Sequence, residues 1–250
     1  MLLLITVSIV LLLAGWEANA WKDNVAVKDV RVSGVRMLAA KDILALASVD
    51  RTQKLYQVDV SAIRRRIETN PYVESAEVIR DVRGYVSIIV HERVPVAEIV
   101  GEKTVYLDDS ARVLPQVTSA QVLDLPLITG LVPSDELVPG RKVRALSLLN
   151  ALALIDTARA FGDDIYHKIS EVHVKPDGGL VCYTTESGVP VSFGNGNIAV
   201  KLAKLDGFWK EIVVREGAQA LDYVDLRFDD IVVARWNPRQ ELAMHERENP

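Results

Sequence analysis

A glycine-rich loop is the first place in this sequence where chemistry could occur. Gly194, Asn195, Gly196 and Asn197 stand between a strand-like and a helix-like segment, and helix amino termini bind phosphate through free backbone N–H groups. The loop lacks the Lys-Ser or Lys-Thr ending and the third glycine that phosphate-binding loops use. We therefore expect an ordinary turn in which Asn197 caps the next helix.

Pairs of adjacent aspartates are the candidates for acid–base chemistry. They occupy positions 108–109, 163–164 and 229–230. Neighbouring side chains on a strand point to opposite faces, so such a pair would not converge on one substrate. Aspartate is also common in turns and helix caps, where its carboxylate binds backbone N–H groups. Turn and cap roles are therefore favoured for all three pairs.

The histidines and the single cysteine give no metal or nucleophile motif. No HExxH or comparable spacing connects the histidines, which are His91, His167, His173 and His245. Cys182 lies in an apolar run without a cationic neighbour that would stabilise its thiolate. A single cysteine also excludes an intramolecular disulfide and a cysteine-based zinc site. The sequence therefore predicts no catalytic, cofactor-binding or metal-binding residue.

The elements that position these residues begin with a small module at residues 27–96. Its apolar pattern predicts the order strand, helix, helix, strand, strand. Val27, Val30 and Val32 belong to the first strand, and the first helix covers residues 39–47. Asp59 or Ser61 caps the second helix, which ends before Pro71 because proline disfavours helix in the preceding residue. A hairpin with strands 73–80 and 85–93 and a turn at 81–84 completes the module.

Beyond residue 96 the pattern changes to short strands and two helices. The first helix, residues 143–161, is closed by Gly162. The second, residues 197–212, is amphipathic with a polar side formed by Lys201, Lys204, Lys210 and Glu211, and its apolar side is formed by Ile198, Leu202, Leu205, Trp209 and Ile212. The predicted strands cover residues 97–100, 104–107, 113–114, 125–128, 169–174, 180–185, 189–193 and 223–236. We therefore predict an α+β protein with a polar tail at 238–250.

The charge of the chain is modest and unevenly distributed. The formal net charge of the 250 residues is -5. Residues 21–95 carry 13 basic and 10 acidic side chains, whereas residues 96–250 carry 16 and 23. This distribution excludes a strongly cationic surface for nucleic acid.

The amino terminus carries a targeting signal with two interpretations. Residues 1–15 contain no charged side chain, and as a helix they would span roughly 22 Å, short of the ~30 Å hydrocarbon core of a bilayer. Ala18-Asn19-Ala20 favours a cleaved signal peptide, although no basic segment precedes the apolar run. Trp16 and Trp21 instead suit the interfacial belt of a membrane helix. The residues alone leave both interpretations open.

Several motifs resemble the bacterial cell-division family FtsQ/DivIB. LYQVD at 55–59, NPYVESAEVIR at 70–80 and HERVPVAE at 91–98 resemble its POTRA domain, and VDLR at 224–227 resembles its C-terminal signature. The similarity covers nearly the whole chain. One departure is the hairpin turn, where Asp81-Val82-Arg83-Gly84 replaces the usual tryptophan-proline pair. The resemblance implies a membrane anchor at 1–21, a POTRA domain of order β-α-α-β-β at 22–95, and a mixed β domain with two packed helices at 96–237.

The resemblance also implies a function and a location. Family members have one inner-membrane helix and a periplasmic remainder, which settles the amino terminus as an anchor; the missing basic tail suggests a truncated start. The implied role is a non-catalytic scaffold at the division septum that links early and late division proteins and helps control septal wall synthesis. The alternative is a POTRA-bearing component of a secretion or outer-membrane assembly system, which should continue into a membrane barrel.

The implied partners are the small membrane proteins FtsB and FtsL at the last strand, with other division proteins at the POTRA domain. No nucleic acid or small-molecule substrate is expected. A terminal strand presents an open edge, and aromatic residues are typical interface anchors. Phe228 and Trp236 could instead fill the core, because one strand face must be buried. The predicted partner-binding residues are Arg227, Phe228, Asp230, Ile231, Arg235 and Trp236.

Overall fold

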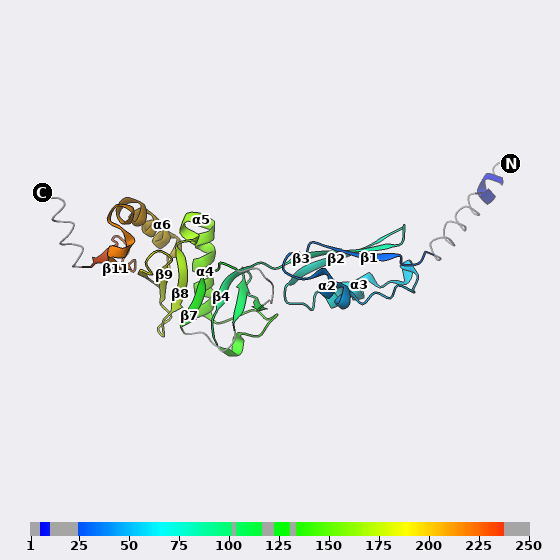
Figure 1. Cartoon of the computed structure of the whole chain (residues 1–250), viewed down its shortest axis with the longest axis horizontal. Coiled ribbons are helices and arrows are strands. Elements are labelled where there is room, and N and C mark those ends of the chain that lie inside the picture. The colour runs from blue at the N-terminus through cyan, green and yellow to red at the C-terminus, as the bar shows by residue number, and fades with distance from the viewer. Residues whose placement is uncertain (1–5, 11–24, 102–103, 117–122, 131–133, 238–250) are drawn as a thin grey trace. The chain divides into compact units, whose positions relative to one another are not determined.

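The computed structural model describes residues 6–10, 25–101, 104–116, 123–130 and 134–237. The chain divides into two compact units, with the boundary between Arg93 and Val94. In each unit helices pack on a sheet (Figure 1). Most of the run at residues 1–15, both flanking tryptophans and the tail at 238–250 lie outside the described residues. Within the described residues, no helix combines the length and apolarity that a bilayer span requires.

The smaller unit has the predicted order of elements. Helices α2 and α3 lie on one side of a three-stranded sheet with strand order β1-β3-β2, in which β1 is parallel to β3 and β3 is antiparallel to β2 (Figure 1). The elements are β1 (Asp29–Ser33), α2 (Ala40–Ala47), the 3₁₀ turn η1 (Leu55–Gln57), α3 (Val60–Ile67), β2 (Val73–Asp81) and β3 (Tyr85–Glu92). The alternating and helical apolar patterns therefore identified these elements correctly.

Local side-chain bonds explain where the elements of this unit begin and turn. Asp59, one of the two predicted caps, accepts a hydrogen bond of 2.9 Å from the backbone N–H of Ala62 at the start of α3. In the β2–β3 turn the Asp81 carboxylate binds the Arg83 guanidinium and backbone N–H, and this contact lowers the pKa of Asp81 to about 2. Gly84 follows with a φ of 99°. An aspartate–arginine clasp and a glycine thus form the turn.

The larger unit is built on one nine-stranded mixed sheet. The strand order is β12-β11-β10-β9-β8-β7-β4-β5-β6, so β12 and β6 are its edges. The strands are β4 (Pro95–Ile99), β5 (Val105–Asp108), β6 (Val113–Pro115), β7 (Leu127–Gly130), β8 (Ile169–Val174), β9 (Leu180–Thr184), β10 (Pro190–Gly194), β11 (Leu221–Asp225) and β12 (Val233–Trp236).

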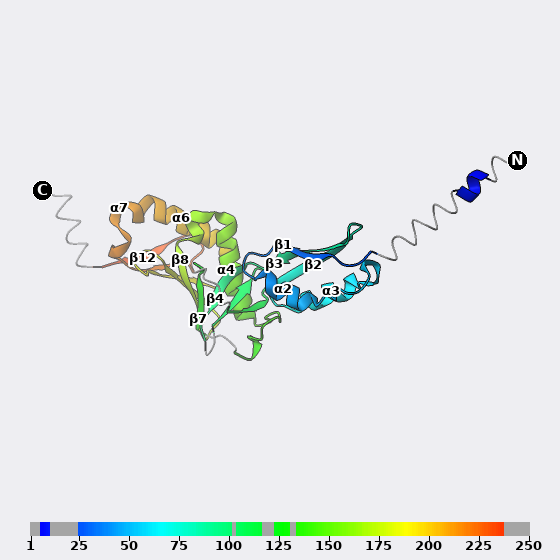
Figure 2. The same ribbon diagram turned by 45° about the vertical axis from the view of Figure 1, so that its right-hand side comes forward.

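Helices cover one face of this sheet. Figure 2 shows α4 and α6 on the same side of the strands, where Leu148, Ile155, Leu202 and Leu205 enter one apolar core with the inward residues of the sheet. The helical segments are η2 (Ser134–Glu136), α4 (Leu146–Phe161), α5 (Asp163–Tyr166), α6 (Ile198–Phe208), the π-helical η3 (Trp209–Val213), α7 (Val214–Glu216) and η4 (Ala218–Ala220). As predicted, Gly162 ends α4.

Two details of the helix predicted at 197–212 were wrong. Lys201 is buried instead of lying on the polar side, because its ammonium donates hydrogen bonds to backbone carbonyls. The π-helical turn after Trp209 inserts extra backbone into the helix and shifts its faces. Val213 therefore enters the core, while Ile212 is only partly buried.

The single strand predicted at 223–236 was also wrong. The segment forms two antiparallel strands, β11 and β12, separated by a loop at 226–232. Asp229 and Asp230 lie in this loop, so the turn role favoured for the pair is the correct one. Asp108 has a comparable role, since its carboxylate accepts hydrogen bonds from Ser110 and Arg112.

Candidate docking surface

The β11–β12 hairpin forms one end of the large sheet. β11 pairs in parallel with β10 and antiparallel with β12, placing Tyr223 opposite Arg235 and Leu221 opposite Trp236. Among the described residues no strand pairs with the outer side of β12. Its alternate N–H and C=O groups therefore form an edge of about 13 Å that another strand can join.

An aspartate–arginine pair fixes the first half of the loop at 226–232. The Asp225 carboxylate accepts hydrogen bonds from Arg227 through the backbone N–H at 3.0 Å, Nε at 2.9 Å and a terminal guanidinium nitrogen at 2.6 Å. These hydrogen bonds, those of the side chain foremost, lower the pKa of the nearly buried Asp225. The Leu226 N–H also donates to the Ser192 carbonyl at 2.9 Å. The loop thus leaves β11 in a defined direction.

A lysine from helix α6 fixes the middle of the same loop. The Lys204 ammonium donates a hydrogen bond of 2.9 Å to the Phe228 carbonyl and a second one to the Asp229 carbonyl. Both contacts reach across 24 or 25 positions of sequence. Lys204 was predicted only as part of the polar side of its helix, and no sequence signal marked its link to the loop.

The glycine-rich loop at residues 194–197 supports this hairpin. The buried Lys201 donates to the carbonyls of Phe193 and Asn195 at 2.7 and 2.9 Å. A Cβ at Gly194 would approach the Arg227 side chain to 3.0 Å, and the φ of Gly194 is 60°. Asn197 occupies the N-cap position of α6 as predicted, but its backbone is left-handed and its side chain makes no capping hydrogen bond. The loop's carbonyls therefore bind an ammonium, and its first glycine leaves room for Arg227.

The exposure of the aromatic residues decides between core and surface roles. Phe228 is 49% exposed and Ile231 is 57% exposed, so neither fills the core. Trp236 differs, because it is partly buried and packs against the core of the larger unit. The core alternative is therefore wrong for Phe228 and partly right for Trp236.

The predicted partner-binding residues lie in two neighbouring elements. The loop carries Arg227, Phe228, Asp230 and Ile231, and β12 carries Arg235 and Trp236. Arg235 lies 3.7 Å from Asp222 in an exposed ion pair. Sequence reasoning missed Tyr223, which is 37% exposed and pairs with Arg235 across the hairpin. Alternation along the strand was the available signal, but the assumption of one long strand hid it.

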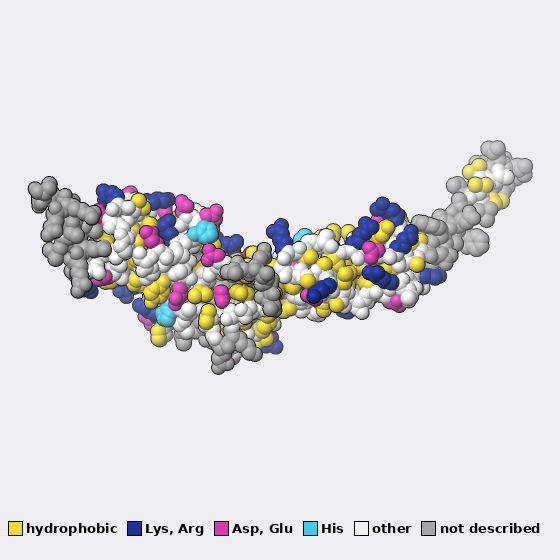
Figure 3. All heavy atoms as spheres, viewed as in Figure 1, with side chains coloured by type: hydrophobic (Ala, Val, Ile, Leu, Met, Phe, Trp, Pro, Cys, Tyr) yellow, Lys and Arg dark blue, Asp and Glu magenta, His cyan; other side chains and the backbone are white. Residues whose placement is uncertain are grey.

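Charged side chains of both signs are mixed on the surface, and the single cysteine is buried. Figure 3 shows basic and acidic side chains interspersed over the visible face. Burial raises the pKa of Cys182, which keeps the thiol protonated. Among the described residues no cluster of three metal-ligating side chains occurs. What the described residues of this hairpin offer is a strand edge that no described strand joins, beside a loop whose backbone is held and whose apolar side chains are exposed.

Comparisons with known proteins match both units. Residues 25–93 match the family described as POTRA domain, FtsQ-type, and residues 98–227 match the family described as Cell division protein FtsQ/DivIB, C-terminal. A relative named Cell division protein FtsQ from Geobacter sp. (strain M21) is 35% identical over 206 residues, covering 82% of this chain and 74% of the relative. One of the same name from Rhodothermus marinus is 31% identical over 240 residues, covering 93% and 85%.

Proposed function

The chain belongs to the FtsQ/DivIB family of cell division proteins, and from this we propose that it is a non-catalytic scaffold of the divisome. Its amino-terminal segment anchors it in the inner membrane, and the rest of the chain lies in the periplasm at the division septum. There it links early and late division proteins and helps to control septal wall synthesis. It does so by holding partners together and not by transforming a substrate.

The open edge of β12 is the observation that carries this proposal. An added strand would gain main-chain hydrogen bonds along the edge, and the exposed Phe228 and Ile231 would supply the apolar contact. We assign this docking surface to FtsB and, through it, FtsL. Its contact residues are the six predicted ones together with Tyr223. The ties from Lys204 and Asp225 reduce the ordering cost on binding, because the loop is already fixed.

A charge at Phe228 tests the proposed docking surface. Phe228→Asp should weaken binding of the periplasmic segment of FtsB by about 2 kcal/mol, or roughly thirtyfold in Kd, because an apolar anchor is lost. Phe161→Asp is the matched control, since Phe161 is an exposed phenylalanine of the same unit at the end of α4. Biolayer interferometry with the immobilised FtsB segment measures both variants, and circular dichroism checks their fold. Equal affinity of folded Phe228→Asp and wild-type protein would refute the assignment.

The smaller unit is proposed to recruit the chain to the septum. Among the described residues no strand pairs with the outer side of β2, where the Glu68 carboxylate accepts a hydrogen bond from the Ala76 N–H, and Ile79 and Val82 are exposed beside it. A shallow cleft of about 230 Å³ runs between α3 and β2, with Val60, Arg64 and Val78 among its lining residues. Other division proteins would bind here. Deletion of residues 27–95 should abolish septal localisation of a fluorescent fusion, and unchanged localisation would contradict the proposal.

The membrane anchor is proposed from the uncharged run at residues 1–15. Trp16 and Trp21, which both follow this run, would sit at the interface on its periplasmic side. Alkaline carbonate extraction tests the anchor, since an anchored chain stays in the membrane fraction. Release of a chain that has lost residues 1–20 would instead establish a cleaved signal peptide.

A further inference from the structure

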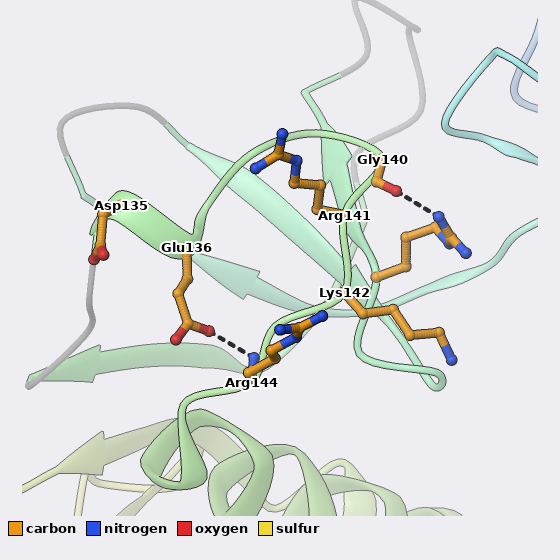
Figure 4. A pocket seen from close by; sticks show the side chains of 7 residues that line it. Asp135, Glu136, Gly140, Arg141, Lys142 and Arg144 are labelled. Atoms are coloured by element: carbon orange, nitrogen blue, oxygen red, sulfur yellow. Dashed lines mark hydrogen bonds between the residues drawn. The ribbon is translucent and has the colours of Figure 1, made fainter.

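A basic cleft lies at the β6 end of the large sheet. It has a volume of about 670 Å³ and is lined by Arg112, Asp135, Glu136, Gly140, Arg141, Lys142 and Arg144 (Figure 4). The segment that leads into α4 covers this edge: the Gly140 N–H donates to the Val113 carbonyl, and the Val113 N–H donates to the Arg141 carbonyl, both at 2.8 Å. The backbone N–H and carbonyl groups of Val113 are thus already hydrogen-bonded, so a ligand at this end would be bound by side chains.

The cleft is positive within an acidic part of the chain. Residues 96–250 carry 16 basic and 23 acidic side chains, whereas the lining has four cations and two carboxylates. Within the described residues, none of these four cations forms an ion pair. A local excess of positive charge on a negative unit favours an anionic ligand.

Among the described residues neither carboxylate of the lining forms an ion pair with the cations. Glu136 accepts hydrogen bonds from the backbone N–H groups of Arg144 and Ala145 at 2.6 and 2.8 Å, and these bonds, together with a smaller contribution from the charge of Arg144, lower its pKa. It therefore stays ionised, bound to the backbone N–H groups of the two residues that precede α4. Figure 4 shows Asp135 pointing away from the basic side chains. The guanidinium and ammonium groups of Arg141, Lys142 and Arg144 thus keep their hydrogen-bonding capacity for a ligand.

Arg112 adds a cation that is partly withdrawn from water. One terminal nitrogen of its guanidinium donates to the Gly140 carbonyl, which holds the side chain against the segment that leads into α4. Its Nε is buried without a hydrogen-bond partner among the described residues. A partly desolvated cation without a counter-ion is costly, so an anion in the cleft would relieve that cost.

We propose that this cleft binds an acidic peptide segment of another protein. Carboxylate side chains would pair with Arg141, Lys142 and Arg144 by charge-assisted hydrogen bonds, which for arginine can be bidentate. Val138 and Leu146 border the same segment and are 39% and 71% exposed, so apolar residues of the peptide would have contacts that an isolated anion would not use. The two acidic side chains of the lining disfavour a continuous anionic membrane surface.

This second docking site is independent of the proposed surface at β12. β6 and β12 are opposite edges of the same sheet, and no residue is shared between the two. A protein with both sites could hold two partners at once, one by strand addition and one by charge. Trp236→Ala should therefore leave peptide binding at the cleft unchanged.

Fluorescence anisotropy of the full-length chain in neutral detergent tests the cleft. The probe is a fluorescein-labelled peptide of alternating glutamate and leucine, and its partner probe has glutamine in place of glutamate. Arg141→Gln/Arg144→Gln should weaken binding of the acidic probe by about tenfold, and 0.5 M NaCl should weaken it as well. The matched control Arg65→Gln/Arg215→Gln removes two exposed arginines elsewhere and should stay within about twofold of wild type.

Each alternative outcome has a distinct signature. Equal binding of the glutamate and glutamine probes, or equal loss in both double variants, would overturn the proposal. Full competition by inorganic phosphate at the concentration of the peptide would reassign the cleft to a small anion. Binding to vesicles containing phosphatidylglycerol that is lost only in Arg141→Gln/Arg144→Gln would assign it to a membrane surface. Thermal unfolding of each variant verifies that the fold is kept.

Discussion

β12 and β6 end the same nine-stranded sheet, and the chain finishes the two edges differently. The outer side of β12 meets no further strand among the described residues, and the loop beside it presents Phe228 and Ile231 to solvent. The outer side of β6 is covered by backbone hydrogen bonds from residues 140 and 141, and the cover carries cations. One edge thus offers main-chain groups and apolar side chains, while the other offers charge.

The difference shows two ways in which a sheet can limit uncontrolled association at its edges. Exposed strand edges promote aggregation unless they are short, covered or charged. β6 is covered and charged, whereas β12 is limited to four residues, Val233–Trp236, and is held beside a fixed loop. The proposed function makes this edge, which no described strand joins, the binding edge. The following changes test that contrast in order of expected effect.

Trp236→Ala should have the largest effect on the β12 edge. The indole packs against the core and belongs to the proposed contact surface, so the variant should lose about 2 kcal/mol or more of FtsB binding and about 1–2 kcal/mol of unfolding free energy. Calorimetric titration and chemical denaturation measure the two quantities. Leu114→Ala on the fully buried face of β6 is the control. Leu114→Ala should lose about 2–5 kcal/mol of unfolding free energy and should bind FtsB as wild type does. A loss of FtsB binding equal to that of Trp236→Ala would contradict the difference between the two edges.

Lys204→Met should have an intermediate effect on FtsB binding, and it tests what the fixed loop contributes to that binding. The variant loses the hydrogen bonds to the carbonyls of Phe228 and Asp229, so the loop must be ordered on binding at a cost of about 1 kcal/mol. Lys210→Met is the matched control, because Lys210 forms only an exposed ion pair with Asp206. Its affinity for the partner should match that of wild type. Surface plasmon resonance that finds the two variants alike would show that loop order does not matter.

The sequence predicted the elements whose signal is contained in a short segment, and it missed the contacts that join distant segments. The order of elements in the smaller unit followed from alternation and from Pro71, and each of these signals is contained in a few residues. The hairpin at 221–236 was missed because its loop contains no glycine or proline, leaving only Asp229 and Asp230 as turn signals. Lys201 was misplaced because its partners, the carbonyls of Phe193 and Asn195, are backbone groups with no sequence signature.

The same limit applies to the candidate site. Its aromatic and aliphatic members could be named from a terminal segment that resembles the family's C-terminal signature. The sequence could not predict that some of these residues lie in an exposed loop and others in a half-buried strand. That arrangement depends on the hydrogen bond from Lys204 of α6 and on the hydrogen bond from Leu226 to β10. Those contacts join segments that are far apart in sequence, and periodicity reports only on neighbours.

Acid should have the smallest effect and should act through Asp225. Hydrogen bonds from Arg227 lower its pKa, so the stabilisation is complete above the ordinary aspartate value of about 3.9 and is lost as pH falls through the lower folded value. Protonation of Asp225, as pH falls through its lowered folded pKa, breaks the Asp225–Arg227 link and should loosen the loop. In Asp225→Asn this part of the pH dependence should be absent. Tryptophan-fluorescence unfolding between pH 6 and about pH 3 compares the two, and identical slopes would contradict the role of Asp225.

Hydrogen–deuterium exchange of the full-length chain, with and without the periplasmic segment of FtsB, tests the central claim most directly. Strand addition at β12 should slow exchange of backbone amides in residues 226–236 and leave those of β6 unchanged, because only the open edge gains main-chain hydrogen bonds. Unchanged exchange across 226–236 in the saturated complex, or protection at residues 113–115 instead, would contradict the account.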